Sequence, residues 1–160
     1  MRMFKLLLLS AVTMSMAPVC FPSGVLEDVR KIQVDATVIE QPDKIKDKAA
    51  AKLVRYDLRA AVRDALFEEG DSPVRAHFVL DEFSPQGGAK RLMDFGTGRS
   101  IRTVEGTLVV LGAGGKELAS VRIHFRGSIA FDPAEGNPGQ GRQPASEFEQ
   151  RLLQEIERLK

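Results

Sequence analysis

The sequence predicts an α+β fold: a two-layer sandwich in which two helices cover one face of a four-stranded mixed sheet, in the order β-α-β-β-β-α. Two kinds of hydrophobic periodicity carry this prediction. Four segments alternate apolar and polar residues, which is typical of strands with one buried face. Two others repeat apolar residues at helical spacing. We expect the opposite face of the sheet to be exposed to water.

Two alternating segments before residue 84 predict the first two strands. Residues 30–40 and 74–83 each place apolar side chains at every second position. The expected inward rows are Ile32, Val34, Ala36 and Val38 in the first segment, and Val74, Ala76, Phe78 and Leu80 in the second. The glycine-rich residues 84–98 then predict a loop.

A long amphipathic helix is expected between these two strands, within residues 41–73. Asp43 can cap its N-terminus, and Gly70 and Pro73 mark its end. Apolar residues recur at helical spacing along the segment, and they predict the face that packs on the sheet. That face consists of Ile45, Ala49, Leu53, Tyr56, Ala60 or Ala61, and Leu66.

The third and fourth strands are expected to form a hairpin whose register can be predicted. Its two-residue turn would be Gly114 and Gly115, because glycine accepts the positive φ such turns need. This turn pairs Val104 with Phe125, Glu105 with His124, Thr107 with Arg122, Leu108 with Val121, and Val110 with Ala119. A slip by one residue would mix polar and apolar side chains on each face. We therefore expect this register, with Phe125 in the core.

The C-terminal segment predicts the second amphipathic helix. Ser146 and Glu149 fit a capping box at its start. Glu147 lies four residues before Arg151, the spacing of a helical ion pair. The expected buried stripe is Phe148, Leu152, Ile156 and Leu159.

The N-terminus predicts export. Arg2 and Lys5 precede an apolar run, which is the architecture of a secretory signal peptide in residues 1–20. The run is shorter than the roughly 20 apolar residues of a membrane-spanning helix. The expected location is the periplasm or the outer membrane.

Cys20, the single cysteine of the chain, lies just past the apolar run. A bacterial lipoprotein carries its acylated cysteine at this place, so membrane attachment through a lipidated Cys20 is one hypothesis. Ordinary secretion and an uncleaved anchor are the alternatives. Residues 21–30 are expected to be a linker, followed by a single domain at residues 31–160.

The candidate binding surface is the polar row of the last strand or, alternatively, the two glycine-rich loops at residues 84–98 and 131–146. Arg122, His124 and Arg126 alternate with the apolar row and are expected on the water-exposed face. They are either a solvated face with cross-strand pairs or a surface for an acidic partner. A metal or small-molecule site formed by His124, His77 and Glu105 is a further hypothesis. It would need three or four ligands at about 2 Å, and the sequence fixes no distance between the histidines.

Composition argues against several functional classes. The formal net charge is +1, without the basic excess that nucleic-acid binding requires. There is no Trp and only one Tyr to stack on bases. No serine lies in a G-x-S-x-G context, and no set of nucleophile, base and oxyanion donors can be assembled. We therefore expect no enzymatic activity, no cofactor and no nucleic-acid partner.

Residues 96–128 resemble a bacterial envelope family, the domain of unknown function 4410. The glycine-rich loop of that family is matched by Gly96, Gly98, Arg99 and Ser100. Residues 115–119, "GKELA", match the start of its second hairpin strand, and the resemblance extends over about residues 29–131. It implies a small, often lipidated protein that assists assembly at the outer membrane, and it supplies no catalytic residues.

These observations together predict a non-enzymatic exported protein of the cell envelope. It would bind, or help to assemble, another envelope component, either a protein or a polymer. The alternative is a periplasmic domain that binds a small molecule or a metal ion.

Overall fold

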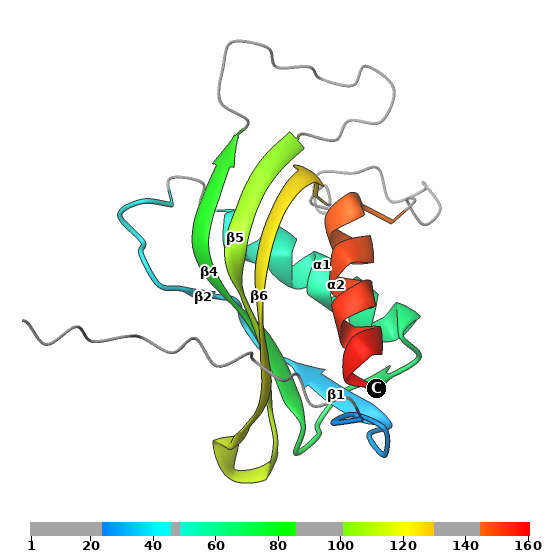
Figure 1. The fold of residues 1–160 in the computed structure, drawn as a ribbon. Helices are drawn as coiled ribbons and strands as arrows, with labels where there is room; N and C mark the ends of the chain where they lie inside the picture. The colour runs from blue at the N-terminus through cyan, green and yellow to red at the C-terminus, as the bar shows by residue number, and fades with distance from the viewer. Residues whose placement is uncertain (1–23, 46–48, 86–100, 130–144) are drawn as a thin grey trace, which may run out of the picture.

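The computed structural model describes residues 24–45, 49–85, 101–129 and 145–160 (Figure 1). The strands are β1 (Lys31–Val34), β2 (Val38–Ile39), β3 (Glu68–Glu69), β4 (Arg75–Pro85), β5 (Ile101–Leu111) and β6 (Glu117–Ser128). The helices are α1 (Ala50–Asp64) and α2 (Glu147–Leu159), and a 3-10 turn, η1, spans Ala113–Gly115. Within these ranges, no helix has both the length and the apolar character needed to cross a membrane.

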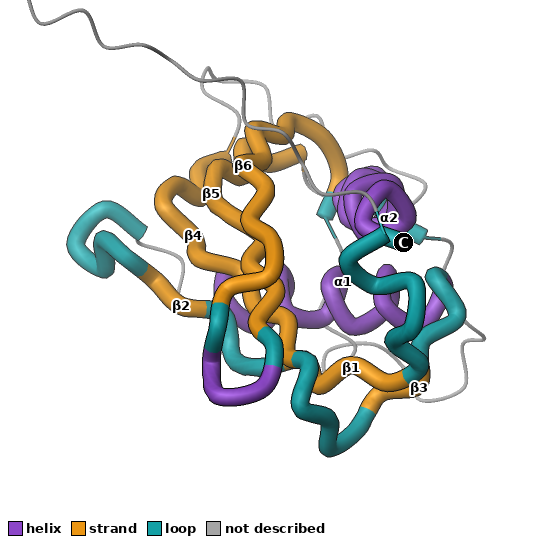
Figure 2. Tube along the Cα trace, turned by 60° about the horizontal axis from the view of Figure 1, so that its bottom comes forward, coloured by secondary structure: helices purple, strands orange, loops and turns teal. Residues whose placement is uncertain are grey.

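The predicted α+β sandwich is confirmed. The sheet has the order β3-β1-β4-β5-β6, with β2 also beside β4. β4, β5 and β6 are antiparallel, whereas β1, β2 and β3 run parallel to their neighbours. α1 and α2 pack on each other and lie on the same side of the sheet (Figure 2). There are six strands rather than four, because the first expected strand is divided and β3 is added.

A one-residue bulge divides the first expected strand. Val34 of β1 pairs with Ala76 of β4. Val38 of β2 pairs with Val79, so the chain takes four steps where β4 takes three. Because side chains alternate with a period of two, the extra residue exchanges the two faces. The inward positions expected for Ala36 and Val38 are therefore wrong: both are exposed, Val38 by 48%.

A second bulge lies in β4. Leu80 pairs with Gly106 and Glu82 pairs with Glu105, which leaves Asp81 as the additional residue. Phe83 consequently takes the next inward position and is only 4% exposed. β4 also continues to Pro85, so the loop expected from residue 84 starts after the strand.

The hairpin register is confirmed at all five predicted pairs. The predicted two-residue turn is wrong. The turn is Ala113–Gly115, closed by a hydrogen bond from the Gly112 amide to the Lys116 carbonyl at 2.7 Å. Gly114 and Gly115 have φ values of 72° and 78°, the region that favours glycine. A register shift beside the turn absorbs the difference in length.

The buried face of α1 differs from the predicted stripe. Tyr56 is 43% exposed and Leu66 is 86% exposed. The buried residues are Ala50, Val54, Asp57, Leu58, Ala60, Ala61 and Val62. Because Asp57 lies in this face, the spacing of apolar residues alone could not reveal it. Asp43 is also not the cap: α1 begins after Ala49, which makes no side-chain capping bond.

The start of α2 is confirmed, and its apolar stripe is buried as predicted. The Ser146 hydroxyl accepts a hydrogen bond from the Glu149 amide at 2.9 Å. The predicted ion pair between Glu147 and Arg151 does not form, because each side chain has another partner. Arg151 instead pairs with Glu155, and the Nη2 and Oε1 atoms of the two side chains are 2.6 Å apart. The Glu147 carboxylate accepts from the Ser128 amide at 2.7 Å, which joins α2 to the end of β6.

An aromatic cluster joins α2 to the sheet. The Phe148 ring meets the Phe78 ring edge-on at 5.8 Å and lies 5.1 Å from the Phe125 ring. Phe78 and Phe148 are fully buried, whereas Phe125 is half-buried at the margin of the core, not inside it as expected. The Phe78 ring lies over Gly106, where a Cβ atom would collide with the ring and with the Val79 carbonyl.

The folded domain begins before residue 31. Leu26 is 1% exposed, and its amide donates to the Leu159 carbonyl at 2.8 Å. Val25 and Val29 pack against the core beside it. The described part of the expected linker, residues 24–30, therefore belongs to the domain.

Candidate functional site

The two helices cover one face of the sheet (Figure 2). The candidate site lies on the other face, where alternate side chains of β6 are exposed. The β5–β6 register places Thr107 beside Arg122 and Glu105 beside His124 on this face. Arg126 lies one pair further along β6. The three residues predicted as a binding surface are all exposed here, as the alternation of β6 predicts.

Acidic side chains lie beside Arg122 and His124. The Nη1 atom of Arg122 contacts the carboxylate of Asp81. The Nη2 atom of the same guanidinium lies 4.0 Å from Glu105 Oε2. The His124 Nδ1 atom is 2.6 Å from Glu105 Oε1. The side chain of Asp81 is only 13% exposed, whereas that of Arg122 is 60% exposed. The bulge in β4 places Asp81 here, and this contact was not predicted from the sequence.

Glu40 completes the group from the edge of the sheet. Its amide donates to the Leu80 carbonyl at 3.2 Å, which holds the end of β2 against β4. A hydrogen bond with Asp81 and repulsion from its charge raise the pKa of Glu40 above that of an ordinary carboxyl. Arg122 acts in the opposite direction. We call these five residues the open-face cluster: Glu40, Asp81, Glu105, Arg122 and His124.

The open-face cluster is mixed in charge. The Arg122 guanidinium contacts one carboxylate and the His124 ring lies beside another, so acidic groups interrupt what would otherwise be a basic field. The cluster offers both hydrogen-bond donors and acceptors at an exposed surface. It therefore suits a polar partner that can exchange hydrogen bonds with it better than a purely acidic one.

The structure does not bring the hypothetical metal ligands together. His77 pairs with Val109, whereas His124 pairs with Glu105, four residues away along β5. At roughly 3.3 Å per residue, the two histidines are separated by about 13 Å along the strand direction alone. A shared metal ion needs contacts of about 2 Å. Across the described ranges, no group of three or more His, Cys, Asp or Glu residues could hold a metal ion.

The other predicted site residues lie outside the described residues. These are the lipidation candidate Cys20 and the loop residues Gly96, Gly98, Arg99 and Ser100. The proposed signal in residues 1–20 lies outside them as well.

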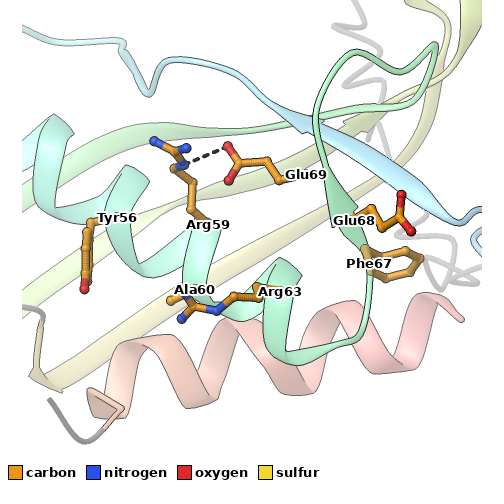
Figure 3. Close-up of a pocket in the computed structure, with 7 residues that line it drawn as sticks. All are labelled: Tyr56, Arg59, Ala60, Arg63, Phe67, Glu68 and Glu69. Atoms are coloured by element: carbon orange, nitrogen blue, oxygen red, sulfur yellow. Dashed lines mark ion pairs between the residues drawn. The ribbon is translucent and has the colours of Figure 1, made fainter. Parts of the chain in front are cut away.

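A cleft of about 560 Å³ lies between α1 and β3 (Figure 3). Its lining consists of Tyr56, Arg59, Ala60, Arg63, Phe67, Glu68 and Glu69. Figure 3 shows Arg59 reaching across to Glu69, and their Nε and Oε1 atoms are 2.7 Å apart. This cleft was not predicted from the sequence, because Tyr56 was expected in the core. The exposed spacing of Arg59 and Arg63 on α1 was the available signal.

Fold and surface together define a two-layer α+β domain with a polar, open sheet face. The sequence matches no protein-family model and no curated protein. Its fold is similar to two structures of the PelC dodecamer from Paraburkholderia phytofirmans, one of them a point variant, each at 11% identity. For the variant, the TM-score is 0.53 with 81% of this chain and 86% of PelC covered. For the other PelC structure, the TM-score is 0.54, and the match covers 87% of this chain and 93% of PelC.

A minor lipoprotein from Acinetobacter baumannii is a more distant match, with 10% identity and a TM-score of 0.38. The match covers 80% of this chain and 92% of that protein.

Proposed function

We propose that this chain is an exported, non-enzymatic protein of the bacterial envelope that is attached to a membrane through Cys20. It binds another envelope component through the open-face cluster. The observation that carries the proposal is this group of paired acidic and basic side chains on an uncovered sheet face. The basic and apolar N-terminus supports export. The absence of catalytic activity is part of the proposal and rests on the sequence.

The expected partner is a polar protein or polymer of the periplasm or outer membrane. Arg122 and His124 can donate hydrogen bonds to carbonyl, hydroxyl or carboxylate oxygens, while Glu40 and Glu105 can accept from hydroxyl or amide groups. Exposed ion pairs contribute little to folding stability. Their substitution should therefore affect binding more than it affects the fold.

Site-specific photocrosslinking in cells tests this proposal. A photoreactive amino acid replaces Arg126, beside the cluster, or Arg158, whose side chain is 67% exposed on α2. We expect one discrete cross-linked product from the Arg126 position that is absent from the Arg158 position. The same product should weaken when Arg122→Ala is added. Equal products from both positions, or none from position 126, would contradict the proposal.

A second candidate is self-association. The fold is similar to that of PelC, which is described as a dodecamer. Light scattering on the purified mature protein tests it: a mass of several protomers supports assembly with copies of itself. A monomeric mass would remove this candidate and leave a different component as the partner.

A further inference from the structure

Leu66 has an unusual position at the end of α1. Its amide bonds to the Arg63 carbonyl at 3.0 Å, and the Phe67 amide bonds to the Val62 carbonyl at 3.2 Å. This is a Schellman motif, in which the residue at the place of Leu66 adopts a left-handed conformation and is usually glycine. Leu66 has a φ of 66° and is 86% exposed. Neither backbone preference nor burial explains a leucine here, and such strain often accompanies function.

The end of α1 lies beside the start of the described chain. The Lys160 Nζ atom contacts the Ala65 carbonyl and lies 4.8 Å from the centre of the Phe67 ring. Lys160 follows Leu159, whose carbonyl accepts from the Leu26 amide. Both views show the C-terminus close to these segments (Figures 1 and 2). We call this end of the molecule the Leu66 pole; it comprises residues 24–26, 65–67 and 159–160.

We propose that the Leu66 pole faces a phospholipid membrane, with the Leu66 side chain entering the boundary between headgroups and acyl chains. The proposal rests on the attachment through Cys20. Four residue steps separate Cys20 from Gly24, and they span at most about 14 Å when fully extended. An acylated Cys20 would therefore hold residues 24–26, and with them Leu66, close to the bilayer.

The composition around Leu66 fits a membrane interface. Tyr56, Arg59 and Arg63 follow one another at helical spacing on α1. Leu66 lies just beyond the end of this helix, and all four side chains are exposed. Tyrosine and long basic side chains favour the headgroup region, while leucine favours the acyl boundary. Because Arg59 is paired with Glu69 and Arg63 with Asp64, electrostatic attraction to anionic lipid is partly cancelled at both arginines. We therefore expect insertion of Leu66, rather than charge, to set the orientation.

Tryptophan fluorescence tests the proposal, because the chain contains no Trp. The mature full-length variants L66W and V38W are placed on vesicles of phosphatidylethanolamine and phosphatidylglycerol. Val38, 48% exposed on β2, is the matched control. We expect L66W fluorescence to shift to the blue and to be quenched at least about twofold more than that of V38W by lipids brominated near the headgroup. Equal quenching of the two variants would overturn the proposal.

An intact mass on the same samples separates this inference from the proposed attachment. If Cys20 carries no acyl groups, the attachment proposal fails. Coupling the Cys20 thiol to a maleimide-headgroup lipid then restores the tether, and the comparison of L66W with V38W still decides the orientation. High salt is the second readout: quenching that persists supports insertion, and quenching that disappears contradicts it.

Discussion

The hairpin of β5 and β6 and the helix α1 show how differently a sequence specifies a sheet face and a helix face. In the hairpin, every predicted cross-strand pair is present. In α1, Tyr56 and Leu66 were assigned to the core and are exposed, while the polar Asp57 is fully buried. A strand has only two faces, so one correct pair determines the others wherever no bulge intervenes. A helix has no such constraint when alanines and a buried carboxylate occupy its inner face.

The largest expected effect is in the aromatic cluster, where α2 meets the sheet. Phe148→Ala should destabilise the fold by about 3–5 kcal/mol, because the side chain is fully buried. Phe125→Ala should cost less, about 1–3 kcal/mol, because Phe125 is half-buried. Urea unfolding of both variants measures the difference. An equal loss would place Phe125 in the centre of the core.

Gly106→Ala sharpens the register of β5 against β4. The added methyl group would meet the Phe78 ring and the Val79 carbonyl. We expect a loss of about 1–3 kcal/mol in the free energy of unfolding. Gly114→Ala, where no atom lies within 4 Å of the added carbon, provides a comparison limited to the backbone cost of positive φ. A neutral Gly106→Ala would contradict the packing of Phe78 over β5.

The two predicted helix caps offer a direct contrast. Ser146→Ala removes the hydrogen bond to the Glu149 amide and should cost about 1 kcal/mol. Asp43→Ala should stay within about 0.5 kcal/mol, because Asp43 does not cap α1. Thermal unfolding of the pair measures both effects. A larger effect at Asp43 would show that the helix begins earlier.

Leu66→Gly should stabilise the isolated domain, which is unusual for the loss of a side chain. Glycine accepts the φ of 66° without the steric cost that a Cβ atom incurs. The greater freedom of glycine in the unfolded chain offsets part of this gain, which leaves about 0.5–1 kcal/mol. Urea unfolding in the absence of lipid is the measurement. A clear destabilisation would mean that Leu66 makes stabilising contacts.

The smallest expected effect is a pH dependence in the open-face cluster. The pKa of Glu40 is raised in the folded protein, chiefly by the hydrogen bond with Asp81 and by its charge. The folded state therefore binds this proton more tightly than the unfolded state. The resulting stabilisation is complete below the unfolded pKa and is lost as the pH rises through the folded pKa. Side-chain NMR titration should show the pKa of Glu40 falling in Asp81→Asn, and an unchanged value would reject this cause.

The sequence allowed the layers of the fold and the position of Arg122, His124 and Arg126 to be predicted, because period-two alternation determines both. It did not reveal the bulges before Val38 and at Asp81, since a single additional residue leaves no compositional trace. The bulge at Asp81 changes the interpretation of the site. It places a carboxylate beneath Arg122 and turns an expected basic surface into one that mixes acidic and basic groups.

Long-range contacts explain what else was missed. The cleft beside α1 depends on β3, a strand of two residues that lacks a readable periodicity. The burial of Leu26 depends on the end of α2, more than a hundred residues away. Neither contact can be inferred from local spacing.

The intact mass of the mature protein, taken from native membrane and soluble fractions, tests the central claim most directly. We predict a membrane-bound species that begins at Cys20 and is heavier than the polypeptide by a diacylglycerol and a fatty acyl chain. An unmodified species in the soluble fraction, cleaved elsewhere, would contradict attachment through Cys20.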